Sequence, residues 1–500
     1  MDEAKHAFWW QRLLAGWCSR IVAAVVLVVI VAGLYLANRF LTDRPVVYED
    51  IVEHYKYGST GGERESGFPY LVWKAMPELC AAQLPGKGYQ SVGMLFEGDR
   101  DLPVGVSKRR VTGIDRVFLN CAVCHTSTVR DRRDAQPRLI VGMPANNFNV
   151  LAFQNFFFQC AKSDRFTPEY VIAAIEGQGT KLDLIDRYLV YPLAVYLMQD
   201  RIRMLSARFS FTERQKPWGP GRVDTFNFAK AIFNFPGDKL APSELAGVSD
   251  FPSIWLQRPR KVADMQLHWD GNNRKVEERN LSAAFGTGAT PPTVDHRAIG
   301  RVEDWLLDLE PPAYPYPIDK AAAERGKVVY GKYCAVCHGR TGRDFSGKLV
   351  GKVTPIAKIG TDRGRLDSYT YELAVNQGQL YAGYDQYWFR NFRKTYGYAN
   401  MPLDGLWLRA PYLHNGSVPT LRALLEPAAR RPVRFYRGYD VYDPDDVGFV
   451  WDIGSENGKP FHLIDTREPG NGNEGHDGPA YGTTLSAADK DALIEYLKTF

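Results

Sequence analysis

The sequence predicts a mainly α-helical fold with two domains, long loops and one membrane-spanning helix at the N-terminus. Three observations predict it: the apolar segment 21–38, the pentapeptide CAVCH at both 121–125 and 334–338, and the proline-rich run 310–319 between the two copies. Five hundred residues, 45% of them hydrophobic, are enough to bury a core in each domain. A net charge of only +5, spread along the chain, argues against nucleic acid as a partner.

The first element is the uncharged segment 21–38, IVAAVVLVVIVAGLYLAN, whose length approaches one bilayer crossing. Basic residues outnumber acidic ones before it, which predicts that residues 1–20 stay in the cytoplasm and the rest is exported. The expected location is the bacterial inner membrane, crossed once, with both domains in the periplasm. A cleaved signal peptide is the alternative, although Leu34 and Tyr35 stand where a cleavage site needs a small residue.

The first domain is predicted over 45–309 as helices joined by long loops. In TPEYVIAAIEG, residues 167–177, a threonine N-cap precedes a proline at the first helical position, and a glycine ends the helix. Segment 299–309 has apolar residues at i, i+3, i+4 and i+7, which predicts an amphipathic helix. The run 310–319, EPPAYPYPID, contains four prolines and is typical of an extended linker.

The second domain is predicted over 320–500. It begins with a helix in which Gly326, Tyr330 and Cys334 follow one another at i+4 intervals on one face. It ends with an amphipathic helix for which Ser486 is the N-cap. Each half thus carries one CAVCH and closes on an amphipathic helix, which indicates an internal repeat at the scale of a domain.

The sequence Cys-x-x-Cys-His is the attachment site of c-type haem, in which two thiols bond the vinyl groups and the histidine reaches the iron. A redox dithiol does not need the histidine, and a zinc site needs a second ligand pair in the same half. Attachment outside the bacterial inner membrane also agrees with export. We therefore predict two cytochrome c-like domains with two covalently bound haem c groups. The attachment residues are Cys121, Cys124, Cys334 and Cys337, and the proximal iron ligands are His125 and His338.

The sixth position on each iron separates electron transfer, which uses a protein ligand, from catalysis, which uses an open site. For the second haem the candidates are Met401, His414, His462 and His476. His476 is favoured because it lies in a glycine-rich loop just before the final helix; a solvated loop histidine is the alternative. For the first haem Met94, Met143 and His268 are possible ligands, and packing is the alternative for each. Cys80 and Cys160 form either a disulfide or two separately buried thiols.

Residues 411–421, PYLHNGSVPTL, resemble the PYxHxGxxxTL segment of bacterial di-haem cytochrome c peroxidases, in a branch related to the di-haem rubber oxygenases. The resemblance covers about residues 45–500 and also includes IGTDRGR, RGYDVYDPDDVGF, GRVDTFN and LHWDGNN. It implies two haems facing a shared interface, the first as reaction centre and the second as relay. His414 matches the family's histidine, which packs near that interface and does not ligate iron, and it is a candidate catalytic residue.

This chain departs from the family at the methionine ligand, where it has Ala428 and Ala429. The departure favours His476 as the distal ligand of the second haem, and a bis-histidine haem has a lower potential than a His/Met one. The rubber-oxygenase branch implies an aromatic first site. The segment 216–233 supplies Trp218 and Phe233 for it, and Arg222 to stabilise the hydroxide leaving a cleaved O–O bond.

The resulting prediction is an enzyme, a di-haem peroxidase. It reduces hydrogen peroxide at the first haem with electrons that an unidentified donor delivers through the second. Two alternatives stay open: an oxygenase that uses dioxygen on apolar substrates, and a membrane-anchored electron-transfer cytochrome with both irons six-coordinate. For all three functions, residues 268–270, His-Trp-Asp, are expected near the inter-haem region. A calcium ion between the domains is possible from the family, although no ligand run identifies one.

Overall fold

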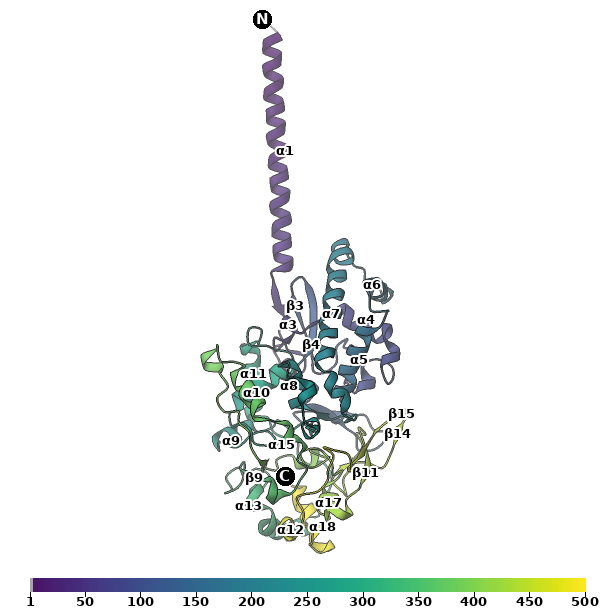
Figure 1. Ribbon diagram of the computed structural model, residues 1–500, viewed down its shortest axis with the longest axis vertical. Coiled ribbons are helices and arrows are strands. Elements are labelled where there is room, and N and C mark those ends of the chain that lie inside the picture. The colour runs from purple at the N-terminus through teal and green to yellow at the C-terminus, as the bar shows by residue number, and fades with distance from the viewer. Residues whose placement is uncertain (1–2) are drawn as a thin grey trace.

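The computed structural model describes residues 3–500, with side chains from residue 16 onward. One long helix, α1 (Glu3–Phe40), projects from a body formed by the remaining residues (Figure 1). Within the described residues one helix is long and apolar enough to cross a membrane: α1 over Gly16–Phe40, which contains an 18-residue stretch with a mean hydropathy of 2.6 and no burial. A membrane span and a signal sequence share these properties. The apolar helix extends beyond the predicted segment 21–38 at both ends.

The first half contains more strand than predicted. Strands β3 (Val106–Val111) and β4 (Ile114–Leu119) form a hairpin, and β1 (Asp43–Pro45) and β2 (Phe68–Pro69) extend it to an antiparallel sheet in the order β1-β3-β4-β2. Its turn residues have positive φ, as a two-residue hairpin turn requires. Threonine and glycine between two alternating runs are the sequence signal of this hairpin, and the prediction of helices and loops missed it. Two further pairs lie in this half: β5 (Thr126–Val129) with β6 (Arg138–Val141), and β7 (Arg222–Val223) with β8 (Ser249–Asp250).

Helices at the two ends of the first half meet beside its CxxCH. Helix α2 (Ile51–Tyr57) packs on α11 (His296–Asp308), with the rings of Tyr55 and Trp305 5.1 Å apart. The predicted helix at 167–177 is α6 (Pro168–Gly177), and the predicted one at 299–309 is the later part of α11. The remaining helices are α3 (Gly62–Glu65), α4 (Tyr70–Leu79), α5 (Val150–Lys162), α7 (Tyr191–Arg208), α8 (Thr225–Ile232), α9 (Gln257–Val262) and α10 (Val276–Gly286).

A disulfide between Cys80 and Cys160 joins the end of α4 to α5, which resolves the choice left open by the sequence. Removing it by the double substitution C80A/C160A is expected to cost about 4 kcal/mol of unfolding free energy, because the bridge closes a long loop in the unfolded chain. Denaturant unfolding of the full-length protein in detergent measures the loss. The variant C18A, which removes a free cysteine, is the control. Equal stability of the two variants would contradict the prediction.

The second half is built around two crossing helices, α12 (Lys320–Tyr333) and α18 (Ala487–Leu497). They touch at Gly326, where a Cβ would lie 1.9 Å from the carbonyl oxygen of Ala492, so only glycine permits the approach. The Ser486 side chain caps α18 as predicted. The predicted linker 310–319 contains neither helix nor strand. The Trp407 indole donates to the carbonyl oxygen of Pro312 and so holds this segment against the second half.

Short elements complete this half. The helices are α13 (Ala335–His338), α14 (Ile356–Ile359), α15 (Gly364–Ser368), α16 (Tyr371–Gln379) and α17 (Leu421–Leu424). The antiparallel pairs are β9 (Val353–Pro355) with β10 (Gly397–Ala399), β11 (Arg434–Arg437) with β16 (His462–Asp465), β12 (Tyr442–Asp443) with β13 (Gly448–Phe449), and β14 (Ser455–Glu456) with β15 (Lys459–Pro460). Helices make up about 45% of the structure.

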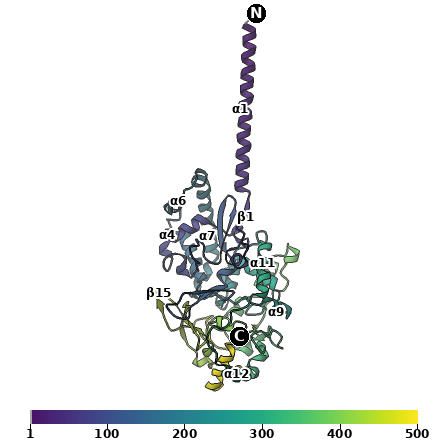
Figure 2. The ribbon, with the colours of Figure 1, turned by 180° about the vertical axis from the view of Figure 1, so that it is seen from behind.

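Three hydrophobic clusters contain buried residues of both halves, and one of them is large. Val129, Met143 and Trp255 of the first half are buried in it together with Tyr330 and Trp407 of the second. Both views show the first half between α1 and the second half, with α12 at the end farthest from α1 (Figures 1 and 2). The junction between the halves therefore forms the middle of the body, and the candidate site lies around it.

Candidate functional site

The histidine of the second CxxCH, His338, lies opposite a second histidine, His476, with the two rings tilted by 46°. His338 Nδ1 lies 2.7 Å from the carbonyl oxygen of Met401, so this nitrogen donates and Nε2 remains for another partner. The ring of His476 lies opposite, with the two centroids 6.2 Å apart. Two imidazoles that bind one metal ion from opposite sides, with bonds of about 2 Å, have centroids about 6 Å apart. The residues here therefore fit a haem iron held between His338 and His476.

His476 is held in an unusual conformation. Its φ of 48° lies in the left-handed region, which costs energy for a residue other than glycine. Its Nδ1 is buried and has no hydrogen-bond partner among the described residues. The buried guanidinium of Arg431 donates to the carbonyl oxygens of Gly475 and His476 and so fixes the loop. Burial lowers the pKa of His476 to about 3 and lowers that of His338, so both rings are neutral at pH 7, as iron ligation requires.

The histidine of the first CxxCH, His125, is oriented by a backbone carbonyl oxygen in the same way as His338. His125 Nδ1 lies 2.8 Å from the carbonyl oxygen of Pro252, and burial lowers the pKa of His125 to about 4. Cys121 and Cys124 are free thiols in apolar surroundings, and burial raises the pKa of Cys121 to about 11. Neutral thiols beside a neutral imidazole fit thioether attachment of haem better than a thiolate metal site.

Within the described part of the chain, the ring that pairs with His125 belongs to Phe251, at 6.4 Å, and not to a second histidine. The other predicted distal candidates have partners elsewhere. His268 Nδ1 lies 2.6 Å from the side-chain oxygen of Asn272, and Met94 and Met143 are buried in two hydrophobic clusters. The two CxxCH sites therefore differ on their distal sides.

Trp269 joins the two backbone segments that hold the proximal histidines. Its indole Nε1 donates to the carbonyl oxygen of Asp250 at 2.8 Å, and its own carbonyl oxygen accepts from the amide of Ala399 at 2.8 Å. Asp250 lies two residues before Pro252, and Ala399 lies two residues before Met401. A short path of covalent and hydrogen bonds thus runs from His125 to His338 through this one tryptophan.

Buried ion pairs lock the halves together around Trp269. Arg437 bonds both carboxylate oxygens of Asp250, at 2.7 and 2.9 Å, and Arg222 lies 3.9 Å from the same carboxylate. Next to Trp269 in sequence, Asp270 binds Arg365 at 2.8 Å. Each aspartate comes from the first half, and Arg437 and Arg365 come from the second. These pairs therefore hold the tryptophan in a rigid, water-poor junction.

Three of the four predicted catalytic residues lie at this junction. Arg222 is fully buried and donates to the carbonyl oxygen of Trp218 and to Asn471, and burial lowers its pKa to about 10. The carbonyl oxygen of His414 accepts from the Asp250 amide, and the His414 Nε2 contacts the Tyr398 hydroxyl at 3.0 Å. Phe233 lies apart, with its ring stacked on Phe285. The structure thus brings Trp218, Arg222 and His414 together but not Phe233, and their catalytic roles stay predictions.

Sequence reasoning missed Arg279 and Arg431. Arg279 lies on α10, and its positive charge adds to burial in lowering the pKa of His125. Burial lowers the pKa of Arg279 itself to about 10, and no carboxylate of a described residue forms an ion pair with it. Both arginines are isolated in sequence from the haem motifs, so no spacing rule pointed to them.

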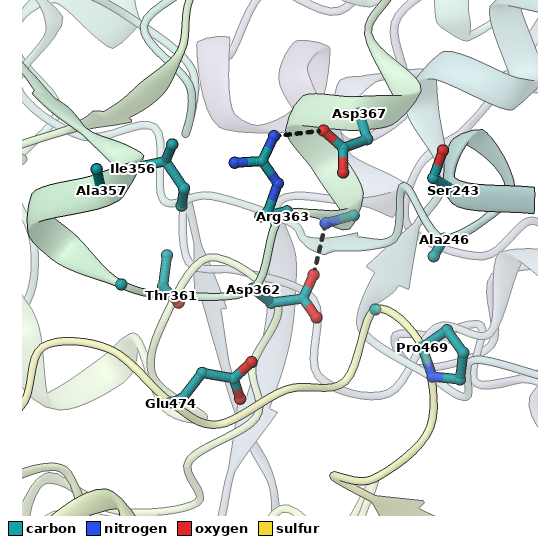
Figure 3. Close-up of a pocket in the computed structure, with 13 residues that line it drawn as sticks. Ser243, Ala246, Ile356, Ala357, Thr361, Asp362, Arg363, Asp367, Pro469 and Glu474 are labelled. Atoms are coloured by element: carbon teal, nitrogen blue, oxygen red, sulfur yellow. Dashed lines mark hydrogen bonds and ion pairs between the residues drawn. The ribbon is translucent and has the colours of Figure 1, made fainter.

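An open pocket of about 560 Å³ borders the loop that carries His476. Its lining includes Ser243 and Ala246 from the first half and Asp362, Asp367 and Glu474 from the second (Figure 3). Asp367 accepts a hydrogen bond from Arg363, and Asp362 accepts one from the amide of Gly364. Among the described residues no group of three or more His, Cys, Asp and Glu side chains is arranged to hold a metal ion. The calcium ion stays a prediction.

Comparisons with known proteins show which families and proteins this chain is similar to. Residues 397–436 match the family described as RoxA-like, cytochrome c-like, which supports the predicted relation to the di-haem rubber oxygenases and implies haem c. The protein y4iM of Sinorhizobium fredii (strain NBRC 101917 / NGR234) is 34% identical over 315 residues, 54% of this chain and 68% of its own length. The protein y4iJ of the same strain is 32% identical over 469 residues, 77% of this chain and 76% of its own length. Both relatives are described as uncharacterized. The match indicates a cytochrome-type oxidoreductase.

Proposed function

We propose that this chain, which belongs to the same family as y4iM and y4iJ, is a di-haem oxidoreductase with a relay haem in its second half and a reaction centre in its first. One observation carries the proposal: His476 faces His338 at 6.2 Å, whereas no histidine of the described chain faces His125 in this way. Two histidine ligands suit electron transfer, and a free iron position suits catalysis.

In this proposal Cys121 and Cys124 attach one haem and Cys334 and Cys337 attach the other. Bound haem would supply a redox-active iron, for electron transfer at the second site and for reaction with a small oxygen species at the first. The protein keeps His125, His338 and His476 neutral by burial and orients the first two through backbone carbonyl oxygens.

Trp269 is the proposed contact between the two sites. Its indole and its backbone bond segments that lead to both proximal histidines. The buried pairs of Asp250 and Asp270 with Arg437 and Arg365 exclude water from its surroundings and hold its position. A rigid, dry junction reduces the reorganisation that accompanies transfer of charge.

Hydrogen peroxide is the proposed substrate. Arg279 is the residue proposed to balance negative charge that develops in the first site, because its guanidinium donates to the side-chain oxygen of Asn280 and forms no ion pair with a described carboxylate, and its charge adds to burial in lowering the pKa of His125. Arg222, the arginine proposed from sequence for this task, instead lies beside the Asp250 carboxylate at the junction. Arg279 therefore takes its place in the proposal. The electron donor is a reduced partner of low potential.

An oxygenase acting on apolar substrates is the second candidate. The match of residues 397–436 to the RoxA-like family favours it, as does the aromatic cluster in which Phe226 stacks on Tyr369 at 4.3 Å. A purely electron-transferring cytochrome is the third class, in which both irons would be six-coordinate.

Cyanide titration of the full-length holoprotein tests the proposal. We expect one of the two haems to bind cyanide and the other to keep its spectrum, because His476 occupies the iron at the second site only. If neither haem binds cyanide, the protein is an electron carrier and the proposal is wrong. Consumption of peroxide by the reduced protein distinguishes a peroxidase, whereas dioxygen uptake on addition of an apolar alkene distinguishes an oxygenase.

The proposed location is a membrane that α1 crosses once, with the body on the outer side of the bacterial inner membrane. The length and composition of Gly16–Phe40 support the crossing, and the excess of basic residues before it supports the orientation.

A further inference from the structure

An exposed apolar ridge lies on the first half. It consists of six side chains within residues 184–197: one just before a π-helical segment (Asp186–Val190), and the others in that segment and in the first half of α7. Their exposed fractions lie between 54% and 75%. The members are Leu184, Tyr188, Leu189, Leu193, Tyr196 and Leu197. So dense a group of exposed large apolar side chains is typical of a surface that contacts a partner.

The pattern of α7 shows that this surface is not an ordinary outer face. Tyr191, Val195, Met198 and Ile202 form its buried stripe against the body. From Gln199 onward the outward positions are mostly polar, as expected of an amphipathic helix. Before Gln199 the outward positions are apolar as well, and a helix that is apolar all round is normally covered on every side.

The ridge is fastened to the end of α1. The Arg39 guanidinium forms ion pairs with Asp183 and Asp186, which flank and begin the π-helical segment. The Phe40 ring lies against Gly113, where a Cβ would approach it to 2.6 Å. Strand β1 follows at once and pairs with β3. In both views the end of the body that carries α6 and α7 rises beside the last turns of α1 (Figures 1 and 2).

We propose that this ridge lies in the headgroup interface of the same bilayer that α1 crosses. The inference rests on the membrane anchoring proposed above. A surface fixed to the last turn of a membrane-spanning helix meets the bilayer wherever that helix ends. Mixed tyrosine and leucine side chains suit this boundary, since one end of each tyrosine is apolar and the other polar. The body therefore has two membrane contacts, which set its orientation and direct α12 and the second CxxCH away from the bilayer.

Spin labels on three cysteine variants of the full-length holoprotein test the proposal. They are L184C on the ridge, V28C in the middle of α1 and V328C on α12, each in a C18A background. Leu184 and Val328 are both 75% exposed, so they form a matched pair. The protein is placed in vesicles of phosphatidylethanolamine and phosphatidylglycerol. Collisions of each label with dioxygen, which concentrates in lipid, are compared with collisions with a water-soluble nickel complex.

We expect the labels at 28 and 184 to favour dioxygen and the label at 328 to favour nickel. If the label at 184 behaves like that at 328 while that at 28 remains in lipid, the ridge proposal is overturned and the anchor stands. If the label at 28 also lies in water, α1 does not cross the membrane, and both the anchoring and the ridge proposal are rejected. The haem spectrum reports that each variant is folded.

A second set of variants tests whether the apolar side chains hold the ridge in place. With L189D and L193D added, the label at 184 is expected to change from dioxygen-accessible to nickel-accessible. The matched control adds V262D, an exposed position on α9, and should leave the label unchanged. A label at 184 that stays in lipid in the double variant would overturn the role given to the ridge.

Discussion

Replacing His476 with alanine is expected to convert one of the two haems from low-spin to high-spin and to make both haems bind cyanide. His476 lies 6.2 Å from His338 across the second site and contributes the only imidazole that faces it among the described residues. Its removal opens the sixth position, because the side chain that replaces it cannot reach an iron. Absorption spectra of the ferric holoprotein measure the change.

His462 provides the matched control for this substitution. It is a partly buried histidine of the same half, and its ring lies against Gly219. H462A should leave both haems as in the unaltered protein. An unchanged spectrum in H476A, or the same change in both variants, would reject the ligand role of His476.

Replacing Asp250 with alanine is expected to lower the unfolding free energy by about 3–5 kcal/mol, the usual cost of removing one partner from a buried ion pair. Arg437 is almost completely buried and bonds both oxygens of this carboxylate, and Arg222 lies beside it with no exposure. Both guanidinium groups would remain buried near each other without their counter-charge. Denaturant unfolding of the full-length protein, followed by haem absorbance, measures the loss.

The pair of Asp308 with Arg258 is the control, because it has the same two-bond geometry on the surface. D308A should leave the unfolding free energy nearly unchanged, since exposed ion pairs gain little over hydration. Equal losses in D250A and D308A would show that the junction between the halves does not depend on its buried charges.

Much of the architecture follows from local signals. The position of Thr167 before α6, the side-chain cap of Ser486, the Gly326-Tyr330-Cys334 spacing and the prolines of 310–319 act through neighbouring residues. The structure has α6, α12 and α18 where they were expected, although the Thr167 hydroxyl donates to Glu169 and does not cap α6. The hairpin of β3 and β4 also had a local signal, at Thr112 and Gly113, which the sequence prediction overlooked. This hairpin lies between α2 and Cys121 in the chain. The first CxxCH therefore follows a strand, whereas the second CxxCH directly follows helix α12.

The sequence by itself determined the haem chemistry that we propose for this protein, because two thiols and a histidine at fixed spacing need only adjacent residues to act. It also indicated His476, from the glycine-rich loop before the last helix. What only the tertiary structure decided is which distant groups meet: His476 over His338, Trp269 between the proximal carbonyl oxygens, and Arg437 on Asp250. Apart from the bond of the Trp269 indole to Asp250, which spans 19 positions, these contacts join residues more than a hundred positions apart, and no period or spacing in the chain encodes them. The apolar ridge beside α1 belongs to the same class, since its meaning depends on Arg39 holding it at the end of the helix.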